Sequence, residues 1–587
     1  MNFSELININ PVLSSFFGIS FLIINYFFSF LLINKFNLIN NKKINFIFFN
    51  TSFYFLISSL LLFLILFKVE IFIIKYLFYF IFLCQILFLI SNYKNIFIKN
   101  INFFSKLDYF LILILFLYTF SQISDADSLD YHLGGVLEII RSNNFESRVD
   151  DWYHFRLIGL GEMINFYGLL FYSLNFAQIF QVLAISNLIL ILSLFNKDKK
   201  LNYLIIFSFP IIISLILSAK HMLIITNCYL LIFSLILLKE KILPKTFLAI
   251  LILLLAPLGF KYTYLIYSLP LWLLVILNYK NEINIKNFIL FSFVIFILIP
   301  GSYYLKNFIH YGDPISPFFE FLKNNPNKDL IFFATDLRHS EKIFNFYELP
   351  IIPLIHMLPI QLSNVTLLVS PIVLICYFVF FQKENRFLIY YFAIIYILLF
   401  FSEKSPSRYF LDLYFLGILF FLKNLNYYKK KFYYKFINLS LFPYAIFGIG
   451  MIFYSIFTLS ASTFNKEYFK KTMNHKAHNY EFIQWINNKT NSNDILMFDT
   501  TIRSKSHQNN KMYYYIVANK SFDELKDIIK EKGITKIVVS DENFKKKFEQ
   551  FYNCKKIDSN KLNHATRNPI NSRKSIANIY LLDTRCL

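Results

Sequence analysis

The chain has 587 residues, of which 57% are hydrophobic, 20% aromatic and only 16% charged. A soluble protein carries about 25% charged residues, so this composition excludes a purely soluble enzyme; the 13 Gly and 16 Pro also exclude a collagen-like or disordered chain. A net charge of +22 would suggest nucleic acid as the partner of a soluble protein, but in a membrane protein such an excess lies in the cytoplasmic loops.

Apolar runs that could cross a membrane recur from residue 11 to residue 458. About 20 apolar residues in a helix span about 30 Å of hydrocarbon. The sequence therefore predicts a mainly α fold, a polytopic bundle of 12–14 transmembrane helices. The expected helices are 11–34, 45–67, 71–91, 107–123, 176–195, 201–219, 222–238, 243–260, 262–279, 287–304, 363–381, 387–402, 409–422 and 436–458.

The basic residues of the short loops predict the orientation. Cytoplasmic loops carry an excess of Lys and Arg, and here most of them fall in alternate loops, beginning with the loop after the first helix. We therefore expect the N-terminus and everything after residue 458 to lie outside the cytoplasm. The intervening, outer turns contain Lys68, Lys220, Lys261, Lys404 and Arg408.

Two longer segments, 124–175 and 305–362, are expected as outer loops. Part of the first, 156–172, is apolar enough to resemble a membrane span. A further crossing there would invert every later loop and break the charge asymmetry. We therefore predict a helix that lies in the membrane interface.

The tail, 459–587, is rich in Lys, Asn and Asp. "YEFIQWINNKT" and the capped "SFDELKDIIKEKG" predict helices, and "DILMF" and "TKIVVS" predict short buried strands. The expected unit is a small C-terminal extracytoplasmic α/β domain, which could be a lid or a docking module. Cys554 and Cys586 lie in it, and an oxidising compartment would allow either a disulfide or two free thiols.

The first outer loop begins with "SDADSLDYHLGG", directly after a predicted helix. Ionisable groups beside a bilayer indicate function, although a solvated loop is the simpler alternative. A carboxylate of Asp125, Asp127 or Asp130 could take a proton from a hydroxyl nucleophile or hold a divalent cation. His132 completes the cluster.

Other polar residues are expected on the same outer face. Each alone is more readily explained as a side chain that snorkels to the interface. Together they suit an anionic lipid headgroup and a hydroxyl-bearing acceptor. They are Glu162, Lys220, His221, Asn227, Lys261, Lys306, His310, Asp313 and Arg408.

These residues resemble the motifs of the integral-membrane glycosyltransferases of the C-type fold (GT-C), the group of protein mannosyltransferases and aminoarabinose transferases. The similarity covers about 107–422. The matching motifs, in family order, are Asp127-Ser-Leu-Asp-Tyr131-His132-Leu, Glu162 in "GEMINFYG", Lys261-Tyr262-Thr263, "YYLKNFIHYGDPISP" and Arg408-Tyr409. Gly134-Gly135 and Asn227 depart from the family pattern, and Asn227, which replaces a common acidic residue, puts a metal site in doubt.

The resemblance implies an inverting enzyme that transfers a sugar from a polyprenyl-phosphate donor to a hydroxyl of a lipid, glycan or protein. It would act at the outer face of the bacterial inner membrane, without nucleic acid. The implied domains are 1–106 (extra helices), 107–458 (catalytic core) and 459–587 (periplasmic). A transporter or lipid-linked oligosaccharide flippase is the alternative, and would predict charges in mid-bilayer and paired broken helices.

The resemblance also implies roles for individual residues. Asp127 would be the base, with Asp125 as the second candidate, and His132 would orient Asp127 or the acceptor. The remaining substrate-binding candidates are Lys261, Arg408 and Lys306 for the leaving phosphate, Glu162 for sugar or acceptor hydroxyls, and Tyr131. A divalent metal is the one cofactor left open.

Overall fold

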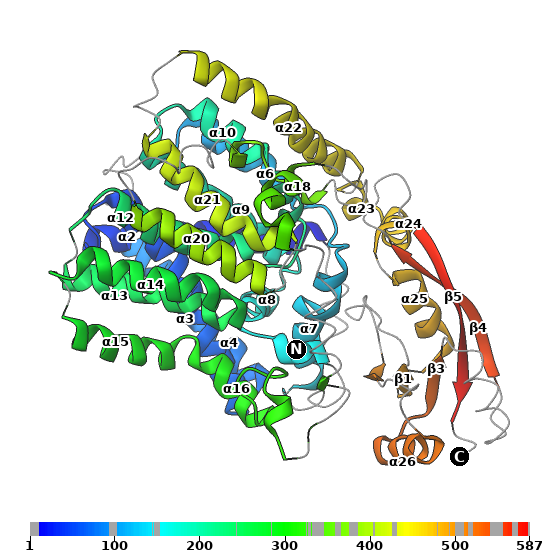
Figure 1. The fold of residues 1–587 in the computed structure, drawn as a ribbon. Coiled ribbons are helices and arrows are strands. Elements are labelled where there is room, and N and C mark those ends of the chain that lie inside the picture. Colours follow the sequence, from blue (N-terminus) through cyan, green and yellow to red (C-terminus); the bar gives the residue numbers. More distant parts are fainter. Residues whose placement is uncertain are drawn as a thin grey trace.

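A large helical bundle and a smaller unit that contains the strands make up the protein (Figure 1). The computed structural model describes residues 11–92, 103–143, 145, 153–241, 243–282, 284–324, 326, 330–331, 346–358, 366–374, 386–402, 406–424, 431–458, 460–477, 479–491, 493–498, 510–514, 521–539, 556–565 and 573–584.

Within the described residues, 6 helical segments are long and apolar enough to cross a membrane, or up to 8 if each of two bent pairs is one span. The protein is therefore a multi-pass membrane protein, as predicted. Fewer segments qualify than the 12–14 expected, because several helices are shorter than a full span. The six are α2 (Pro11–Lys35), α3 (Lys42–Leu66), α4 (Ile71–Ser91), α9 (Phe176–Phe195), α14 (Leu265–Tyr279, with the preceding η5, Tyr262–Tyr264) and α22 (Lys431–Thr458).

Two of the predicted continuous helices are broken. The first break separates α10 (Lys199–Phe207) from α11 (Pro210–Ile216) at 74°, and the second separates α15 (Ile285–Leu298) from α16 (Gly301–Tyr311) at 56°. Pro210 and Pro300 lie at the starts of the second halves. Proline lacks the N–H that would continue the helix, which explains both breaks.

Shorter helices complete the bundle in the predicted order. They are α6 (Lys106–Tyr118), α12 (Met222–Leu237), α13 (Pro244–Leu255, followed by η4, Ala256–Gly259), α20 (Arg386–Phe401) and α21 (Ser407–Asn424). Most of the predicted helix 363–381 lies outside the described residues. The outer segments contribute η1 (Ser128–His132), α7 (Gly134–Ser142), η3 (Tyr153–Leu157), α8 (Leu160–Leu170), η6 (Glu320–Leu322), η7 (Phe346–Ile351) and α18 (Ile352–Met357).

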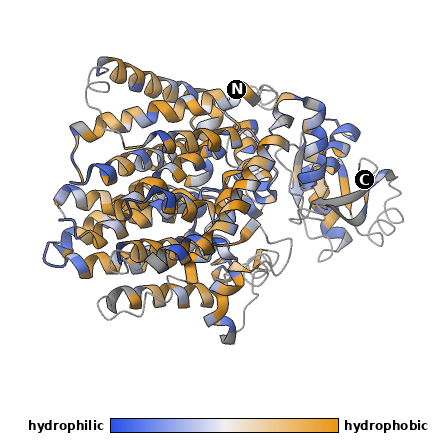
Figure 2. Cartoon of the chain, turned by 90° about the horizontal axis from the view of Figure 1, so that it is seen from above, coloured by the Kyte–Doolittle hydropathy of each residue, from blue (hydrophilic) through white to orange (hydrophobic). Residues whose placement is uncertain are grey.

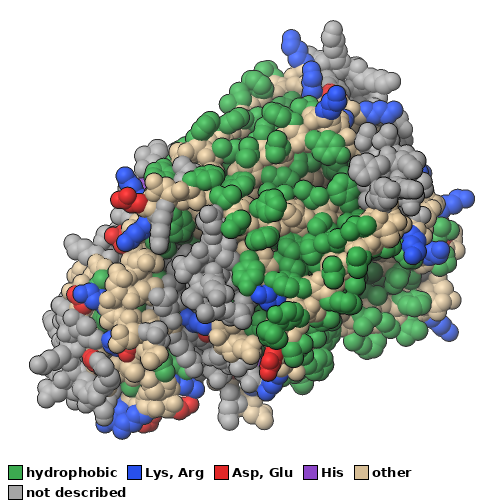
Figure 3. Space-filling model, turned by 180° about the vertical axis from the view of Figure 1, so that it is seen from behind, with side chains coloured by type: hydrophobic (Ala, Val, Ile, Leu, Met, Phe, Trp, Pro, Cys, Tyr) green, Lys and Arg blue, Asp and Glu red, His purple; other side chains and the backbone are tan. Residues whose placement is uncertain are grey.

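The surface of the bundle is apolar. Figure 3 shows hydrophobic side chains across one face, and Figure 2 shows that the C-terminal unit is much more hydrophilic. Phe80, Phe293 and Phe457 are 63%, 63% and 74% exposed. Apolar patches of this extent are rare on soluble monomers, so they indicate contact with lipid.

Helix α8 is not the interfacial helix that the sequence predicted. All of its residues are buried, so it has no face for the membrane interface. Glycines explain the close packing: a Cβ at Gly168 would lie 2.2 Å from the Cβ of Phe176, and one at Gly159 would lie 2.4 Å from the carbonyl oxygen of Gly259. The helix is thereby held inside the protein, beside α3, α7 and α9.

The C-terminal unit is a small α/β domain, as predicted. Its sheet has the order β2-β1-β3-β5-β4, with β1 parallel to β2 and β3, and β5 antiparallel to β3 and β4. One apolar core includes α25 and the other includes α26. The elements are α23 (Ala461–Phe464), α24 (Lys466–Lys476), α25 (Tyr480–Lys489), β1 (Ile495–Phe498), β2 (Lys511–Tyr514), α26 (Phe522–Lys532), β3 (Lys536–Val539), β4 (Lys556–Ala565) and β5 (Arg573–Asp583).

The predicted strands "DILMF" and "TKIVVS" are β1 and β3. Strands β2, β4 and β5 were not predicted: β2 has only four residues, β4 is mostly polar and β5 begins with polar residues. Cys554 and Cys586 lie outside the described residues, so their pairing stays a prediction.

Candidate active site

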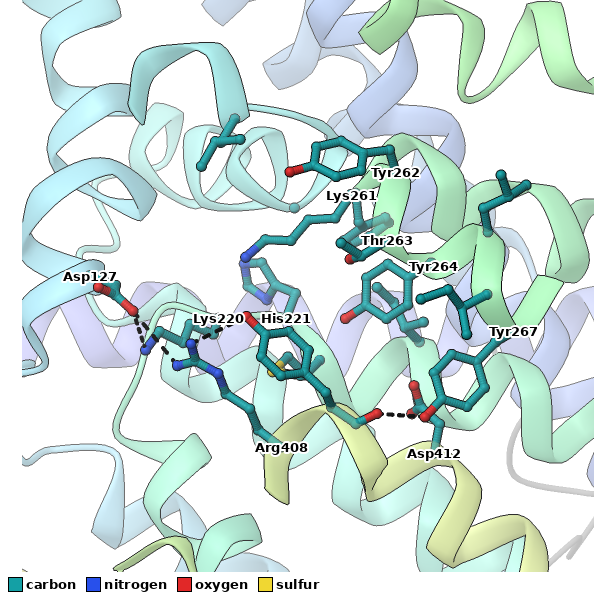
Figure 4. A pocket seen from close by; sticks show the side chains of 18 of the residues that line it. Asp127, Lys220, His221, Lys261, Tyr262, Thr263, Tyr264, Tyr267, Arg408 and Asp412 are labelled. Atoms are coloured by element: carbon teal, nitrogen blue, oxygen red, sulfur yellow. Dashed lines mark hydrogen bonds and ion pairs between the residues drawn. The ribbon is translucent and has the colours of Figure 1, made fainter. Parts of the chain in front are cut away.

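A cavity of about 640 Å³ lies between the outer-loop elements and helices α12, α14, α20 and α21 (Figure 4). Its apolar wall includes Leu157, Met222, Ile225, Leu265, Ile266 and Leu399. Most of the residues predicted for the site line it: Asp127, Tyr131, His132, Glu162, Lys261 and Arg408. The sequence motifs therefore converge on one cavity although they come from separate loops.

Two cations bind the acidic residues of the first outer loop. The Lys220 ammonium lies 3.0 Å from Oδ2 of Asp125 and 3.0 Å from Oδ2 of Asp127. The Arg408 guanidinium lies 3.8 Å from Asp127 Oδ2, and Figure 4 shows Asp127 facing both. Burial raises the pKa of Asp125, but the charge of Lys220 and the hydrogen bonds from Ser128 and Lys220 together hold that pKa below its usual value. The cavity thus brings a carboxylate together with two cations.

Asp125 organises the turn that carries the signature. Its Oδ2 accepts hydrogen bonds from the Ser128 backbone N–H (3.0 Å) and hydroxyl (2.7 Å). The next residues form the single π-helical turn η1, closed by a bond of 2.9 Å from Leu133 N–H to the Ser128 carbonyl. Such turns are rare and frequent at functional sites. Asp125 is therefore beside the cavity, where it supports Asp127, rather than in its lining.

His132 pairs with Glu162. Its Nδ1 lies 2.5 Å from Glu162 Oε1, and Glu162 Oε2 accepts from the Gly159 N–H at 2.7 Å. Burial lowers the pKa of His132 despite the bond to Glu162. Burial raises the pKa of Glu162, but His132, the Gly159 N–H and the charge of Lys261 together bring it below its usual value. The pair is therefore a neutral imidazole that donates from Nδ1 to a carboxylate.

This arrangement fixes the imidazole tautomer. With the proton on Nδ1, Nε2 carries a lone pair, and within the described part of the chain it has no hydrogen-bond partner. His132 was predicted to orient Asp127 or the acceptor. Its bonded partner is Glu162 rather than Asp127.

His221 is fixed in the same way. The Asn165 amide nitrogen donates to the carbonyls of His132 (2.9 Å) and Ala219 (3.4 Å), so its oxygen must accept from His221 Nε2 at 2.6 Å. Burial lowers the pKa of His221 to about 3. His221 is therefore neutral and has an acceptor lone pair on Nδ1.

Lys261 lies above Tyr131 in the cavity wall. Its ammonium is 3.3 Å from the Tyr131 hydroxyl and 5.7 Å from the ring centroid. His154 stacks on the same ring at 5.3 Å, and its Nδ1 lies 3.1 Å from Asp130 Oδ2. Burial lowers the pKa of Lys261. A phosphate anion beside it would favour its charged form.

Lys306 does not reach the cavity, contrary to the prediction. Its ammonium donates to the backbone carbonyls of Arg156 (2.9 Å) and Ile158 (2.6 Å) and is fully buried. Asn227 also points elsewhere, since its amide donates to the Ala184 carbonyl at 2.7 Å. These contacts hold elements together rather than face a ligand.

Sequence reasoning missed the roles of Lys220 and Asp412. Lys220 was grouped with the outer-face polar residues without a role. Asp412 interrupts the apolar run of α21 and lines the cavity. An ionisable residue within a membrane helix indicates function by default, and that signal was available in "RYFLDLYF".

The described residues do not favour a divalent metal site. Among them, no group of three or more His, Cys, Asp or Glu side chains has metal-binding geometry. Lys220 already occupies the space between Asp125 and Asp127 and pairs with both carboxylates. No step proposed below uses a metal.

No protein-family model matches the sequence, and no curated protein matches it either. The fold does match solved structures. ArnT from Cupriavidus metallidurans bound to undecaprenyl phosphate has a TM-score of 0.50 and 10% sequence identity, over 82% of this chain and 98% of that one. The apo state of ArnT matches with a TM-score of 0.47 and 10% identity, over 81% and 97%. The chain therefore has the GT-C fold of ArnT, which confirms the fold that its motifs predicted.

Proposed function

We propose that this protein transfers a sugar from a polyprenyl-phosphate donor to a hydroxyl group, with inversion at the sugar. One observation carries the proposal: a single cavity brings the Asp127 carboxylate together with three cations, Lys220, Lys261 and Arg408, beside an apolar wall. A polyprenyl phosphate needs both an anion site and an apolar site. The undecaprenyl phosphate bound to ArnT, which shares the fold, supports this choice of donor.

The chemistry that we propose requires a base and a stabilised leaving group. The acceptor oxygen forms a bond to the anomeric carbon as the carbon–oxygen bond to phosphate breaks, and the phosphate leaves with the electron pair. The acceptor proton passes to Asp127. Lys220, Lys261 and Arg408 would stabilise the charge on the leaving phosphate.

The ion pairs of Asp127 suggest how the base is released. Lys220 and Arg408 bind it in the absence of substrate. A donor phosphate would attract the same cations and leave the carboxylate able to take a proton. The lone pair of His132 would accept a hydrogen bond from a hydroxyl of the acceptor other than the attacking one. Both oxygens of Glu162 are engaged, so we assign it to positioning His132 rather than to sugar hydroxyls.

The transporter alternative is not favoured. It predicted paired broken helices around a site in the membrane, and two bent helix pairs do exist. However, the residues at the two breaks, 208–209 and 299–300, do not line the described cavity. The bends follow from Pro210 and Pro300 instead.

We further propose the cellular setting. The catalytic core would comprise 107–458, with the extra helices of 1–106 before it and the domain 459–587 in the periplasm. The membrane would be the bacterial inner membrane, and the reaction would occur on its outer face. The charge asymmetry of the loops supports this orientation.

The test compares envelope glycolipids and glycans of a deletion strain with those of strains that express variants. A missing sugar unit in the deletion strain identifies the product. Asp127→Asn should lower transfer about 10²–10⁴-fold, the contribution of a positioned base, at a normal membrane level. Asp130→Asn should lower transfer less, because Asp130 pairs with His154. Equal, mild effects at both positions would contradict the assignment of the base.

A further inference from the structure

Asp412 is a buried carboxylate within the helical bundle that the proposed chemistry does not use. It lies in α21, is 5% exposed and lines the cavity. Thr226 donates to its Oδ1 at 2.5 Å. Among the described residues, Thr226 is its only hydrogen-bond or ion-pair partner. A buried carboxylate is unfavourable unless it is paired, so Asp412 needs a further partner.

The tyrosines around Asp412 do not supply that partner. The Tyr267 hydroxyl donates to the Tyr409 carbonyl at 2.5 Å, beside Asp412 in Figure 4. The Tyr229 hydroxyl lies 3.2 Å from the Tyr264 carbonyl and 3.0 Å from the Ser268 hydroxyl. The second oxygen of Asp412 is therefore available to a donor group in the cavity.

The position of Asp412 relates it to the phosphate-binding cations. It follows Arg408 by four residues, so the two side chains share one face of α21. Their Cα atoms are separated by about 6 Å along the helix, a distance that one sugar ring spans. The cavity thus has a cationic end at Arg408 and an acceptor end at Asp412.

We infer that Asp412, held by Thr226, binds the sugar of the donor through a hydroxyl or ammonium group. This inference rests on the proposed function and identifies the subsite for one part of its substrate. The polyprenyl chain has no hydrogen-bond donor, and the phosphate has the same charge as the carboxylate. Within the donor, only the sugar offers a group that Asp412 can bind.

The test uses three variants at equal membrane levels. Asp412→Leu removes the acceptor, Asp412→Asn keeps a neutral acceptor oxygen, and Thr226→Val keeps the carboxylate as a matched control. Transfer is measured as the sugar unit that the deletion strain lacks. Binding of undecaprenyl phosphate, which carries no sugar, is measured with each purified protein. Asp412→Ala replaces Asp412→Leu if the latter is not inserted.

Asp412→Leu should lower the transfer rate about 10- to 100-fold, which is the effect of losing a hydrogen bond to a charged group. Thr226→Val should lower it less than about tenfold. Binding of undecaprenyl phosphate should be unchanged in all variants. If Asp412→Asn transfers sugar at nearly the wild-type rate, the group bound by Asp412 is a hydroxyl. If its transfer rate is as low as that of Asp412→Leu, the group is an ammonium.

Wild-type transfer by Asp412→Leu, or loss of undecaprenyl phosphate binding in both Asp412→Asn and Asp412→Leu, would overturn the inference. The proposed function fails separately. It fails if wild-type protein does not bind undecaprenyl phosphate, or if the deletion strain lacks no sugar unit.

Discussion

Lys220 is the residue on which the acidic pair depends. Its ammonium bridges Asp125 and Asp127, and two adjacent carboxylates without a cation would repel each other. Its position is set by its backbone: the Lys220 carbonyl accepts a hydrogen bond from the Gln181 amide of α9. The turn between α11 and α12 therefore delivers a cation to a loop about 95 residues earlier in the chain.

Lys220→Met should lower transfer and move the acid limb of its pH profile to higher pH. Lys220 lies 3.0 Å from Oδ2 of Asp127, the proposed base, and a carboxylate that loses a cation is protonated more readily. The base would thus be lost earlier as pH falls. The measurement is transfer rate against pH, with Lys199→Met as a control, because Lys199 binds Asp108 far from the cavity. An unmoved acid limb would contradict this role for Lys220.

At the scale of elements, the contact between α8 and the η4–η5 turn positions the site. Gly159 precedes α8 and packs against Gly259, just before Lys261. Its N–H also binds Glu162, which fixes His132. One close backbone approach therefore sets the distance between the His132–Glu162 pair and the Lys261 cation.

Gly159→Ala should destabilise the protein and impair transfer together. The new Cβ would lie 2.4 Å from the Gly259 carbonyl oxygen, so backbone must move, and overpacking of this kind costs about 1–3 kcal/mol. Thermal unfolding in detergent and transfer measure the two effects. Gly450→Ala in α22 is the control, since nothing lies within 4 Å of its Cβ position. A wild-type unfolding temperature for Gly159→Ala would contradict this packing.

The elements differed in how far sequence could predict them. Long apolar helices such as α3 and α9 were predicted. In a membrane, a continuous apolar run of this length forms a helix, because the backbone must satisfy its own hydrogen bonds. The burial of α8 was not predicted, because an apolar helix that packs against protein has the same sequence pattern as one that contacts lipid. Most of the site residues that the motifs predicted do line the cavity. The π turn η1 and the pairing of His132 with Glu162 depend on tertiary contacts that no local pattern encodes.

At the scale of the molecule, contacts connect the C-terminal domain to the segments on either side of the signature residues. Arg141 of α7 donates to the Asn510 carbonyl at 3.4 Å, just before β2. Gln122, after α6, donates to the Thr463 hydroxyl of α23 at 3.2 Å. Both partners in the bundle belong to the segment that leads to or from the signature residues. The domain is therefore attached at the end of the bundle where the cavity lies.

The two ends of α6 give the last prediction, that Lys200 and Ser460 lie in opposite compartments. Near its start, Asp108 binds Lys199 at 3.1 Å. Beyond its end, the Ser121 hydroxyl lies 3.3 Å from the Ser460 hydroxyl. From Asp108 to Ser121, at the helical rise of about 1.5 Å per residue, the two contacts are about 20 Å apart along α6.

Reporter fusions at the two positions measure the compartments, and we expect Lys200 in the cytoplasm and Ser460 outside it. A fusion at Lys43 is the control and should report the same compartment as Lys200. The Lys43 ammonium lies 3.0 Å from the Ser193 hydroxyl, and Ser193 is at the end of α9 that leads to Lys200. If Lys200 and Ser460 report the same compartment, α6 does not cross the membrane. The basic loops would then not set the orientation, and the cavity could not be assigned to the outer face.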